Sequence, residues 1–203
     1  MSAAPDEIVR CTWATSEPIY AAYHDEEWGV PKADDRAFYE KLVLEGFQAG
    51  LSWITILRKR DRFREAFDNF EPERVARYGE AKVAELMADP GIIRNRAKIE
   101  AAITNARALI DLQQSQSLSS FLWHFMEGRP QQNSFRSPRE IPAKTPVSEA
   151  MAKALKAKGF RFCGPTTLYA FMQSVGMVND HLTACHRHAA CARLAKRFSA
   201  PRA

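Results

Sequence analysis

Apolar residues recur every three to four positions along most of this chain of 203 residues, and this spacing constrains its fold more than any other feature. The segment 99–110 shows the pattern clearly, because its apolar side chains fall on one face of a helix. We find no convincing alternation of apolar and polar residues that would indicate a strand. The sequence predicts one all-α domain over residues 1–203, built from eight to ten short helices, with 1–8 and 199–203 as flexible tails.

Proline, glycine and capping residues divide this pattern into short elements. One short helix is expected over 80–88, and a last helix is expected from about Asn179 to Arg197. The segments 113–119 and 128–142 are polar or proline-rich and are expected to be loops.

The charge and the cysteine content narrow the classes of function. Lysine and arginine total 29 against 24 acidic residues, so the net charge is +5, which permits a nucleic-acid partner without requiring one. The N-terminal residues do not resemble a secretory signal, and no apolar run approaches the roughly 18 to 20 residues of a membrane span. We therefore expect a cytoplasmic protein with no membrane partner, whose four cysteines are core residues, metal ligands or reactive thiols.

Two cysteines and two histidines near opposite ends of the chain form a candidate metal site. His181 and Cys185 are four residues apart and would share one face of the expected last helix. With Cys11 and His24 they make a tetrahedral set that suits zinc, and four protein ligands would make the ion structural. Spacing alone leaves a second interpretation open, in which the cysteines are core residues and the histidines lie at the surface. Nearby side chains that could also be ligands are His186, His188 and Cys191.

Glu45 lies on the apolar face of an expected helix that also carries Phe38 and Leu42. A carboxylate there is costly to bury unless it is paired, so Glu45 either reaches solvent or an arginine, or has a function. The aromatic residues that could line a pocket with it, for a flat or cationic group, are Tyr20, Tyr23, Trp28 and Trp53.

A tight turn over residues 90–94 contains Gly91 and is followed by basic residues. Backbone N–H groups at such a turn can hold a phosphate, and Arg94, Arg96 and Lys98 would then suit a nucleic-acid backbone. The same residues are equally consistent with a solvated helix face.

Several segments in order resemble the type I 3-methyladenine DNA glycosylases, a constitutive bacterial family. The matching segments are 10–13, 20–31, 44–54, 91–94 and 159–181, so that the resemblance spans roughly residues 9–185. It implies a helix–hairpin–helix DNA glycosylase fold, with the hairpin at 88–94 and a zinc clasp joining the N- and C-terminal regions. The zinc ligands that it implies are Cys11, His24, His181 and Cys185.

The same resemblance implies an activity and a site. A monofunctional enzyme of base excision repair would flip 3-methyladenine out of alkylated double-stranded DNA and release it by hydrolysis, leaving an abasic site. Glu45 would be the catalytic pocket acid, and Tyr20, Tyr23, Trp28 and Trp53 would surround the base. The residues implied at the DNA surface are Gly50 and Leu51, where Leu51 could fill the gap, together with Gly91 and Arg94 of the hairpin. A monomer is expected.

The sequence departs from the wider superfamily at its usual catalytic aspartate, whose place in the string 178–181 is taken by Asn179. An adenine alkylated at N3 is already cationic and leaves as a neutral base, so its departure requires no acid. Three alternatives remain at this point: a non-catalytic, zinc-stapled module that binds DNA damage, a zinc hydrolase, and a glycosylase that also cleaves the strand through a lysine Schiff base. Two cysteines and two histidines argue against the hydrolase, because catalytic zinc keeps a position for water.

Overall fold

The computed structural model describes residues 8–14 and 16–201. The expected tail residues 1–7 and 202–203 lie outside this described part. At the C-terminal end, Ala200 of the expected tail packs against the core. It follows Phe198, whose ring lies 4.6 Å from that of Trp123. Ala200 is therefore in contact with the domain.

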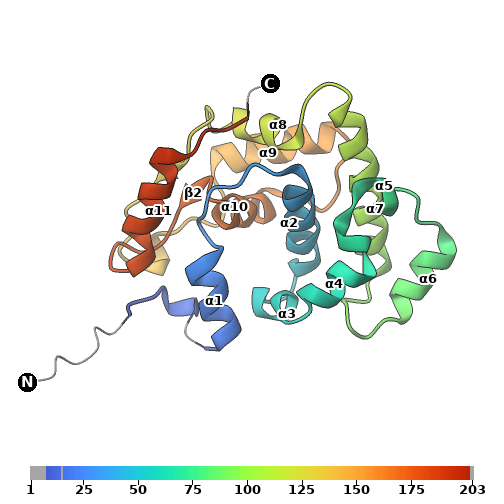
Figure 1. Cartoon of the computed structure of the whole chain (residues 1–203), viewed down its shortest axis with the longest axis horizontal. Coiled ribbons are helices and arrows are strands. Elements are labelled where there is room, and N and C mark those ends of the chain that lie inside the picture. The colour runs from blue at the N-terminus through green and yellow to red at the C-terminus, as the bar shows by residue number, and fades with distance from the viewer. Residues whose placement is uncertain (1–7, 15, 202–203) are drawn as a thin grey trace, which may run out of the picture.

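The described part of the chain is mostly helical, as the sequence predicts (Figure 1). In chain order its α-helices and strands are α1 (Pro18–Glu26), α2 (Asp35–Gln48), α3 (Trp53–Leu57), α4 (Arg60–Ala66), α5 (Pro72–Val75), α6 (Glu80–Ala88), α7 (Arg96–Gln113), α8 (Leu118–His124), β1 (Gln131–Gln132), α9 (Pro146–Ala157), α10 (Pro165–Ser174), β2 (Val178–Asn179) and α11 (His186–Arg197). Short 3-10 helices lie at Thr12–Ala14, Asp68–Phe70 and Pro138–Glu140. No described helix is both long and apolar enough to cross a bilayer.

Helix α2 lies at the centre of the molecule and packs against α3, α7, α8 and α10 (Figure 1). Its first turn is held by Asp34, whose carboxylate accepts a hydrogen bond from the Ala37 N–H at 2.8 Å. The next carboxylate, of Asp35, accepts from the N–H groups of Leu118 and Ser119 and so joins α2 to the start of α8. Because the later turns of α2 are buried almost all round, Glu45 is carried into the interior.

Two expectations from the sequence are wrong in the C-terminal third. Residues 131–132 of the expected loop pair with Val178 and Asn179 as a short parallel ladder, so the chain does contain strands of two residues each. The last helix begins at His186 and not at Asn179. The ladder holds Val178 and Asn179 in an extended conformation that excludes them from a helix, and the chain then turns over 180–185 before α11 begins.

Two tight connections join consecutive helices. Residues 89–95 join α6 to α7, where a hairpin is expected, and residues 158–164 join α9 to α10. The second connection is held against α2 by close packing, since a Cβ on Gly46 would lie 3.2 Å from that of Phe162.

Candidate functional site: an aromatic pocket beside a cysteine–histidine cluster

The aromatic residues singled out in the sequence gather around one cavity of about 290 Å³. Its walls include Glu45 together with Tyr20, Tyr23, Trp28 and Trp53. A cavity of this size is at the lower end of the range for small-molecule sites, so it suits one small, flat ligand. The structure thus brings together the five residues predicted for the pocket.

Glu45 is the acid of this pocket, and its side chain is 5% exposed. Its Oε1 lies 3.2 Å from Nζ of Lys41, which precedes it by one helical turn on α2. Burial raises the pKa of Glu45, and the neighbouring Lys41 ammonium opposes that rise. One of the two interpretations left open by the sequence had Glu45 reaching solvent or an arginine. Its partner is instead a buried lysine, which the spacing of four residues could have indicated.

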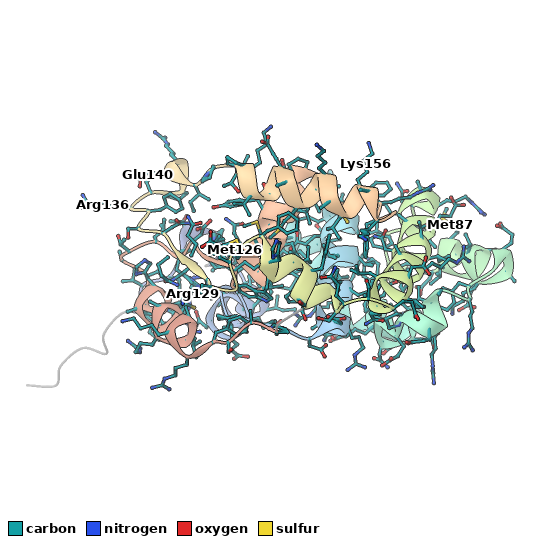
Figure 2. The ribbon with its side chains drawn as sticks, turned by 90° about the horizontal axis from the view of Figure 1, so that it is seen from above. Met87, Met126, Arg129, Arg136, Glu140 and Lys156 are labelled. Atoms are coloured by element: carbon teal, nitrogen blue, oxygen red, sulfur yellow. The ribbon has the colours of Figure 1, made fainter. Side chains whose placement is uncertain are left out.

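The sequence did not indicate the other residues that line the pocket. They are Trp13, Gln48, Pro138, Ile141, Ala170 and Gln173. Gln48 follows Glu45 by three positions on α2, a spacing that places both on one face. Pro138 and Ile141 belong to the expected loop 128–142, which runs along the edge of the molecule, where Figure 2 labels Arg136 and Glu140. No periodicity marks such a loop, so its return to the pocket could not be read from the sequence.

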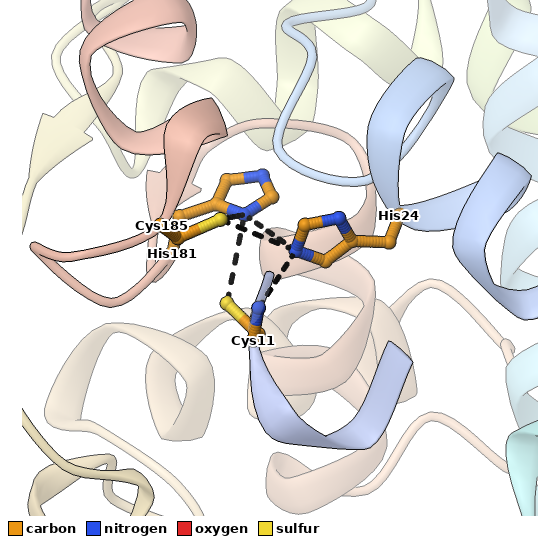
Figure 3. Close-up of side chains that lie close together, drawn as sticks. All are labelled: Cys11, His24, His181 and Cys185. Carbon is orange, nitrogen blue, oxygen red and sulfur yellow. Dashed lines mark hydrogen bonds between the residues drawn. The ribbon is translucent and has the colours of Figure 1, made fainter. Parts of the chain in front are cut away.

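Cys11, His24, His181 and Cys185 form a buried cluster next to this pocket (Figure 3). Their ligand atoms all lie within 4.8 Å of one another. His24 comes from α1, Cys11 precedes the first 3-10 helix, and His181 follows β2. The group could hold a metal ion, and it joins segments from both ends of the chain.

The route by which His181 and Cys185 meet differs from the expected one. They do not share a helical face, because helix α11 starts only after Cys185. Instead the chain turns between them, and Cys185 caps α11 by accepting a hydrogen bond from the Arg187 N–H through Sγ at 3.4 Å. His181 and Cys185 therefore lie together as predicted, although no helix spans the two residues.

The surroundings of His181 and Cys185 favour the protonation states that a metal requires, whereas the hydrogen bond with Cys185 and burial raise the pKa of the Cys11 thiol. Nε2 of His181 donates to the Trp28 carbonyl at 3.0 Å, which leaves Nδ1 facing the cluster. Burial lowers the pKa of His181 and so favours the neutral ring. Hydrogen bonds with Cys11, His181 and His24 lower the pKa of the Cys185 thiol, which favours the thiolate.

The rival ligands lie elsewhere. Nδ1 of His186 is 3.0 Å from the Val9 carbonyl, and Nε2 of His188 is 2.8 Å from the Asn133 carbonyl. Cys191 is buried near the Trp28 carbonyl, with 4.0 Å between Sγ and that oxygen. These three side chains are thus engaged outside the four-residue group.

Trp28 belongs to both the pocket and the cluster. Its ring lines the cavity and also packs edge-on against the His181 ring, with centroids 4.6 Å apart. Its carbonyl accepts the hydrogen bond from His181 described above. The aromatic wall and the candidate metal centre are therefore in direct contact.

Neither Asn179 nor Asp180 of the 178–181 string has a side chain free to act in the pocket. The Asn179 amide donates to Gln132 and to the His188 carbonyl. The Asp180 side chain is fully buried and accepts hydrogen bonds of 2.6 to 2.8 Å from Asn133, Tyr169 and Gln173. Both side chains therefore hold the fold together around β2.

The residues expected at a DNA surface differ in how accessible they are. Leu51 is 44% exposed and follows Gly50, which has a left-handed φ of +81°. Arg94 is exposed in the turn before α7. Lys98, however, is buried and donates to the carbonyls of Phe47 and Ala49, so the suggestion that it contacts phosphate is wrong.

Gly91 and Arg96 complete the expected hairpin. Arg96 is paired with Glu80 and Glu100 on the surface. The Gly91 N–H donates to Asp89 at 2.7 Å, and a Cβ at this position would lie 2.5 Å from Cγ of Arg62. Gly91 therefore packs closely against Arg62 of α4, whose side chain would have to shift to admit a larger residue.

Comparison with known proteins gives consistent matches. The family described as Methyladenine glycosylase matches residues 13–188. The chain is 48% identical over 177 residues to DNA-3-methyladenine glycosylase 1 of Escherichia coli (strain K12), a match covering 87% of this chain and 95% of that protein. It is also similar to a crystal structure of 3-methyladenine DNA glycosylase I, with a TM-score of 0.87, 50% identity, and coverage of 89% of this chain and 100% of the other. A structure of the Staphylococcus aureus enzyme, described as showing 3-methyladenine recognition, matches with a TM-score of 0.85 and 36% identity, covering 88% and 96% of the two chains.

Proposed function

Because this chain belongs to the methyladenine glycosylase family and is therefore a DNA N-glycosylase that releases 3-methyladenine, we propose that Glu45 recognises the base within the aromatic pocket. The main support for this proposal is that one buried carboxylate lies among aromatic walls in a cavity sized for a single base. The enzyme acts in base excision repair and leaves an abasic site in the DNA.

The reaction makes few demands on acid catalysis. An adenine methylated at N3 carries a positive charge while it is bonded to the sugar, and it leaves as a neutral base. Glu45 accepts hydrogen bonds from the base edge, chiefly from the amino group, and its charge favours the cationic lesion. The aromatic walls stack on the flipped base, which offsets the few kcal/mol that flipping costs. Water then attacks the anomeric carbon. Because the base leaves as a neutral molecule, no acid in place of Asn179 is needed to protonate it.

The test of Glu45 is its replacement by glutamine, which keeps the shape of the side chain and removes its charge. We expect kcat/KM for release of 3-methyladenine from methylated DNA to fall about 10- to 100-fold, since a hydrogen bond to a charged group contributes about 1.5–3 kcal/mol. Glu149→Gln on the exposed face of α9 is the matched control and should leave release unchanged. Unchanged release by Glu45→Gln would remove Glu45 from the mechanism. A protein that binds damaged DNA and releases no base would instead support a non-catalytic damage-binding module.

The DNA surface is proposed to contain Gly50, Leu51, Gly91 and Arg94. Leu51 is an exposed apolar side chain on a turn beside the pocket, which suits it to fill the gap left by a flipped nucleotide. Arg94 can contact a phosphate at the helix–hairpin–helix motif proposed for α6, α7 and the turn between them. We propose that the enzyme acts on double-stranded DNA as a cytoplasmic monomer.

The cysteine–histidine cluster is proposed to hold a structural zinc ion. Tetrahedral zinc, with Zn–S of about 2.3 Å and Zn–N of about 2.0–2.1 Å, separates sulfur from nitrogen ligands by about 3.5 Å and nitrogen from nitrogen by about 3.3 Å. Three of the four S···N pairs are 3.5, 3.6 and 3.7 Å apart, and the N···N distance is 3.2 Å. Zinc would supply no chemistry to the reaction with four protein ligands, but would clasp the ends of the domain together.

A further inference from the structure

Lys41 is a buried lysine next to the base pocket for which the proposed mechanism has no role. Its side chain is 13% exposed, and it lies one turn before Glu45 on α2. Burying an ammonium group is costly unless the group is paired and hydrogen-bonded. Three neighbours supply those contacts, and all three line the base pocket.

The contacts of the Lys41 ammonium fix its position closely. Nζ lies 3.2 Å from Oε1 of Glu45 and donates a hydrogen bond of 2.8 Å to the Tyr23 hydroxyl. It also stands 3.3 Å from the centre of the Trp53 ring, as in a close cation–π contact. One charged group therefore touches the acid and two aromatic walls of the pocket.

Lys41 does not itself face the base. It lines a separate, smaller cavity that shares Tyr23 and Trp53 with the base pocket as a common wall, whereas Glu45 lines only the base pocket. A group behind this wall can influence the base only through the residues that it holds. Lys41 is thus placed as a positioning residue, and it is not aimed at the sugar as a Schiff-base nucleophile would be.

We infer that Lys41 holds Glu45 in place as an oriented carboxylate, and that it thereby sets the lowest pH at which the pocket recognises the alkylated base. The inference rests on the proposed function of Glu45. A buried carboxyl without a counter-ion would take up a proton, lose its charge and exchange one hydrogen-bond acceptor site for a donor.

The other charged groups around Lys41 and Glu45 are paired with acidic residues of their own, and the remaining polar groups are uncharged. Arg60 on α4 is bound through both nitrogens to Glu27, and Arg64 is bound to Glu40 at 2.8 Å. Lys32, in the segment after α1, lies 3.9 Å from Glu27. From α10 the walls receive the uncharged Gln173 and Ser174.

The tyrosines of α1 do not add charge near neutral pH. Burial raises the pKa of both Tyr20 and Tyr23. Burial also lowers the pKa of Lys41 to about 8, while Glu45 holds it up, so Lys41 is mostly protonated at neutral pH. Within the described part of the chain, Lys41 is the cation in contact with Glu45.

The test is the replacement of Lys41 by methionine, which has a similar length and no charge. We would measure 3-methyladenine release from methylated DNA under single-turnover conditions from pH 5 to pH 9. The acidic limb of the Lys41→Met profile should move upward by about one pH unit, giving about a tenfold loss on that limb and little loss near pH 8.5. Lys41→Arg should restore the limb. Lys32→Met, which removes a charge from the same rear cavity without touching Glu45, should match the wild type.

A second measurement separates this inference from the proposed role of Glu45. The Glu45 carboxyl is titrated by ¹³C NMR in glutamate-labelled protein, with Glu45→Gln used to identify its signal. Its midpoint should rise by about one pH unit in Lys41→Met and stay in place in Lys32→Met. Unchanged midpoints overturn the inference whatever the activity shows. Full activity of Glu45→Gln overturns the role of Glu45 in recognition, and with it the pH limit on recognition, but leaves the effect of Lys41 on the charge of Glu45 as a separate result. If Lys41→Met does not fold, Lys41→Gln, whose amide can still donate, serves in its place with the same expected shift.

Discussion

Single residues in this site are placed where space and charge leave few alternatives. Glu45 is a buried acid that needs a cation, and Lys41 is a buried cation that needs an acid. Gly29 is a comparable case of space, because it has a φ of +78° and a Cβ there would lie 3.0 Å from Nε2 of His181. The position therefore requires glycine for two independent reasons.

Gly29→Ala tests this packing against the matched variant Gly50→Ala. Both glycines have a left-handed φ, but no atom lies within 4 Å of a Cβ on Gly50. Gly50→Ala should lower the free energy of unfolding by about 1–2 kcal/mol, the cost of the left-handed conformation. Gly29→Ala should lower the free energy of unfolding by about 1–3 kcal/mol more, because His181 must shift. Urea unfolding measures both, and equal losses would contradict the argument.

At the scale of elements, the C-terminal end of α2 and the turn before α7 determine which basic residues can reach DNA. The Lys98 ammonium is held inside, on the carbonyl oxygens that end α2. Arg94, in the turn itself, is exposed. Two cations four residues apart therefore have different roles.

The contrast predicts different responses to salt. Arg94→Met should weaken binding to duplex DNA and reduce by about 1 the slope of log affinity against log salt concentration. Lys98→Met should leave that slope unchanged and lower the free energy of unfolding by about 1.5–3 kcal/mol, because a charged hydrogen-bond donor is lost. Fluorescence anisotropy at several salt concentrations, with urea unfolding, tests both. A smaller slope for Lys98→Met would place it at the DNA.

The elements also show how far the sequence alone predicts the structure. The helical class and the helix over 80–88 follow from periodicity, and the structure confirms them. Helix α11 begins later than expected because β2 pairs with β1, and a pairing of residues 47 positions apart has no local signature. The pocket aromatics were recognised from their residue types, whereas Pro138 and Ile141 reach the pocket only through the path of a loop.

At the scale of the whole molecule, the cysteine–histidine cluster joins residues 170 positions apart, as between Cys11 and His181. Closing so long a loop restricts the unfolded chain, so an ion held there would stabilise the entire fold. The remaining described cysteines make controls available, because Cys163 is also buried but lies in the connection between α9 and α10.

Removal of the ion should therefore act on the ends of the domain first. Cys185→Ala should abolish stoichiometric zinc, measured by elemental analysis, and lower the melting temperature, whereas Cys163→Ala should retain zinc. In hydrogen exchange, a chelator should lower protection in α1 and α11 more than in α2 and α10. Full zinc content in Cys185→Ala, or uniform loss of protection, would argue against a clasp.

Trp28 has a consequence that reaches beyond its two contacts. Its ring is a wall for the base, and its carbonyl orients a ligand of the proposed metal. If binding of the base orders Trp28, the affinity for the metal ion rises, and by thermodynamic linkage the ion raises the affinity for the base by the same factor. An enzyme that lacks the ion would then bind the lesion more weakly, and an enzyme holding its excised base would bind the ion more tightly.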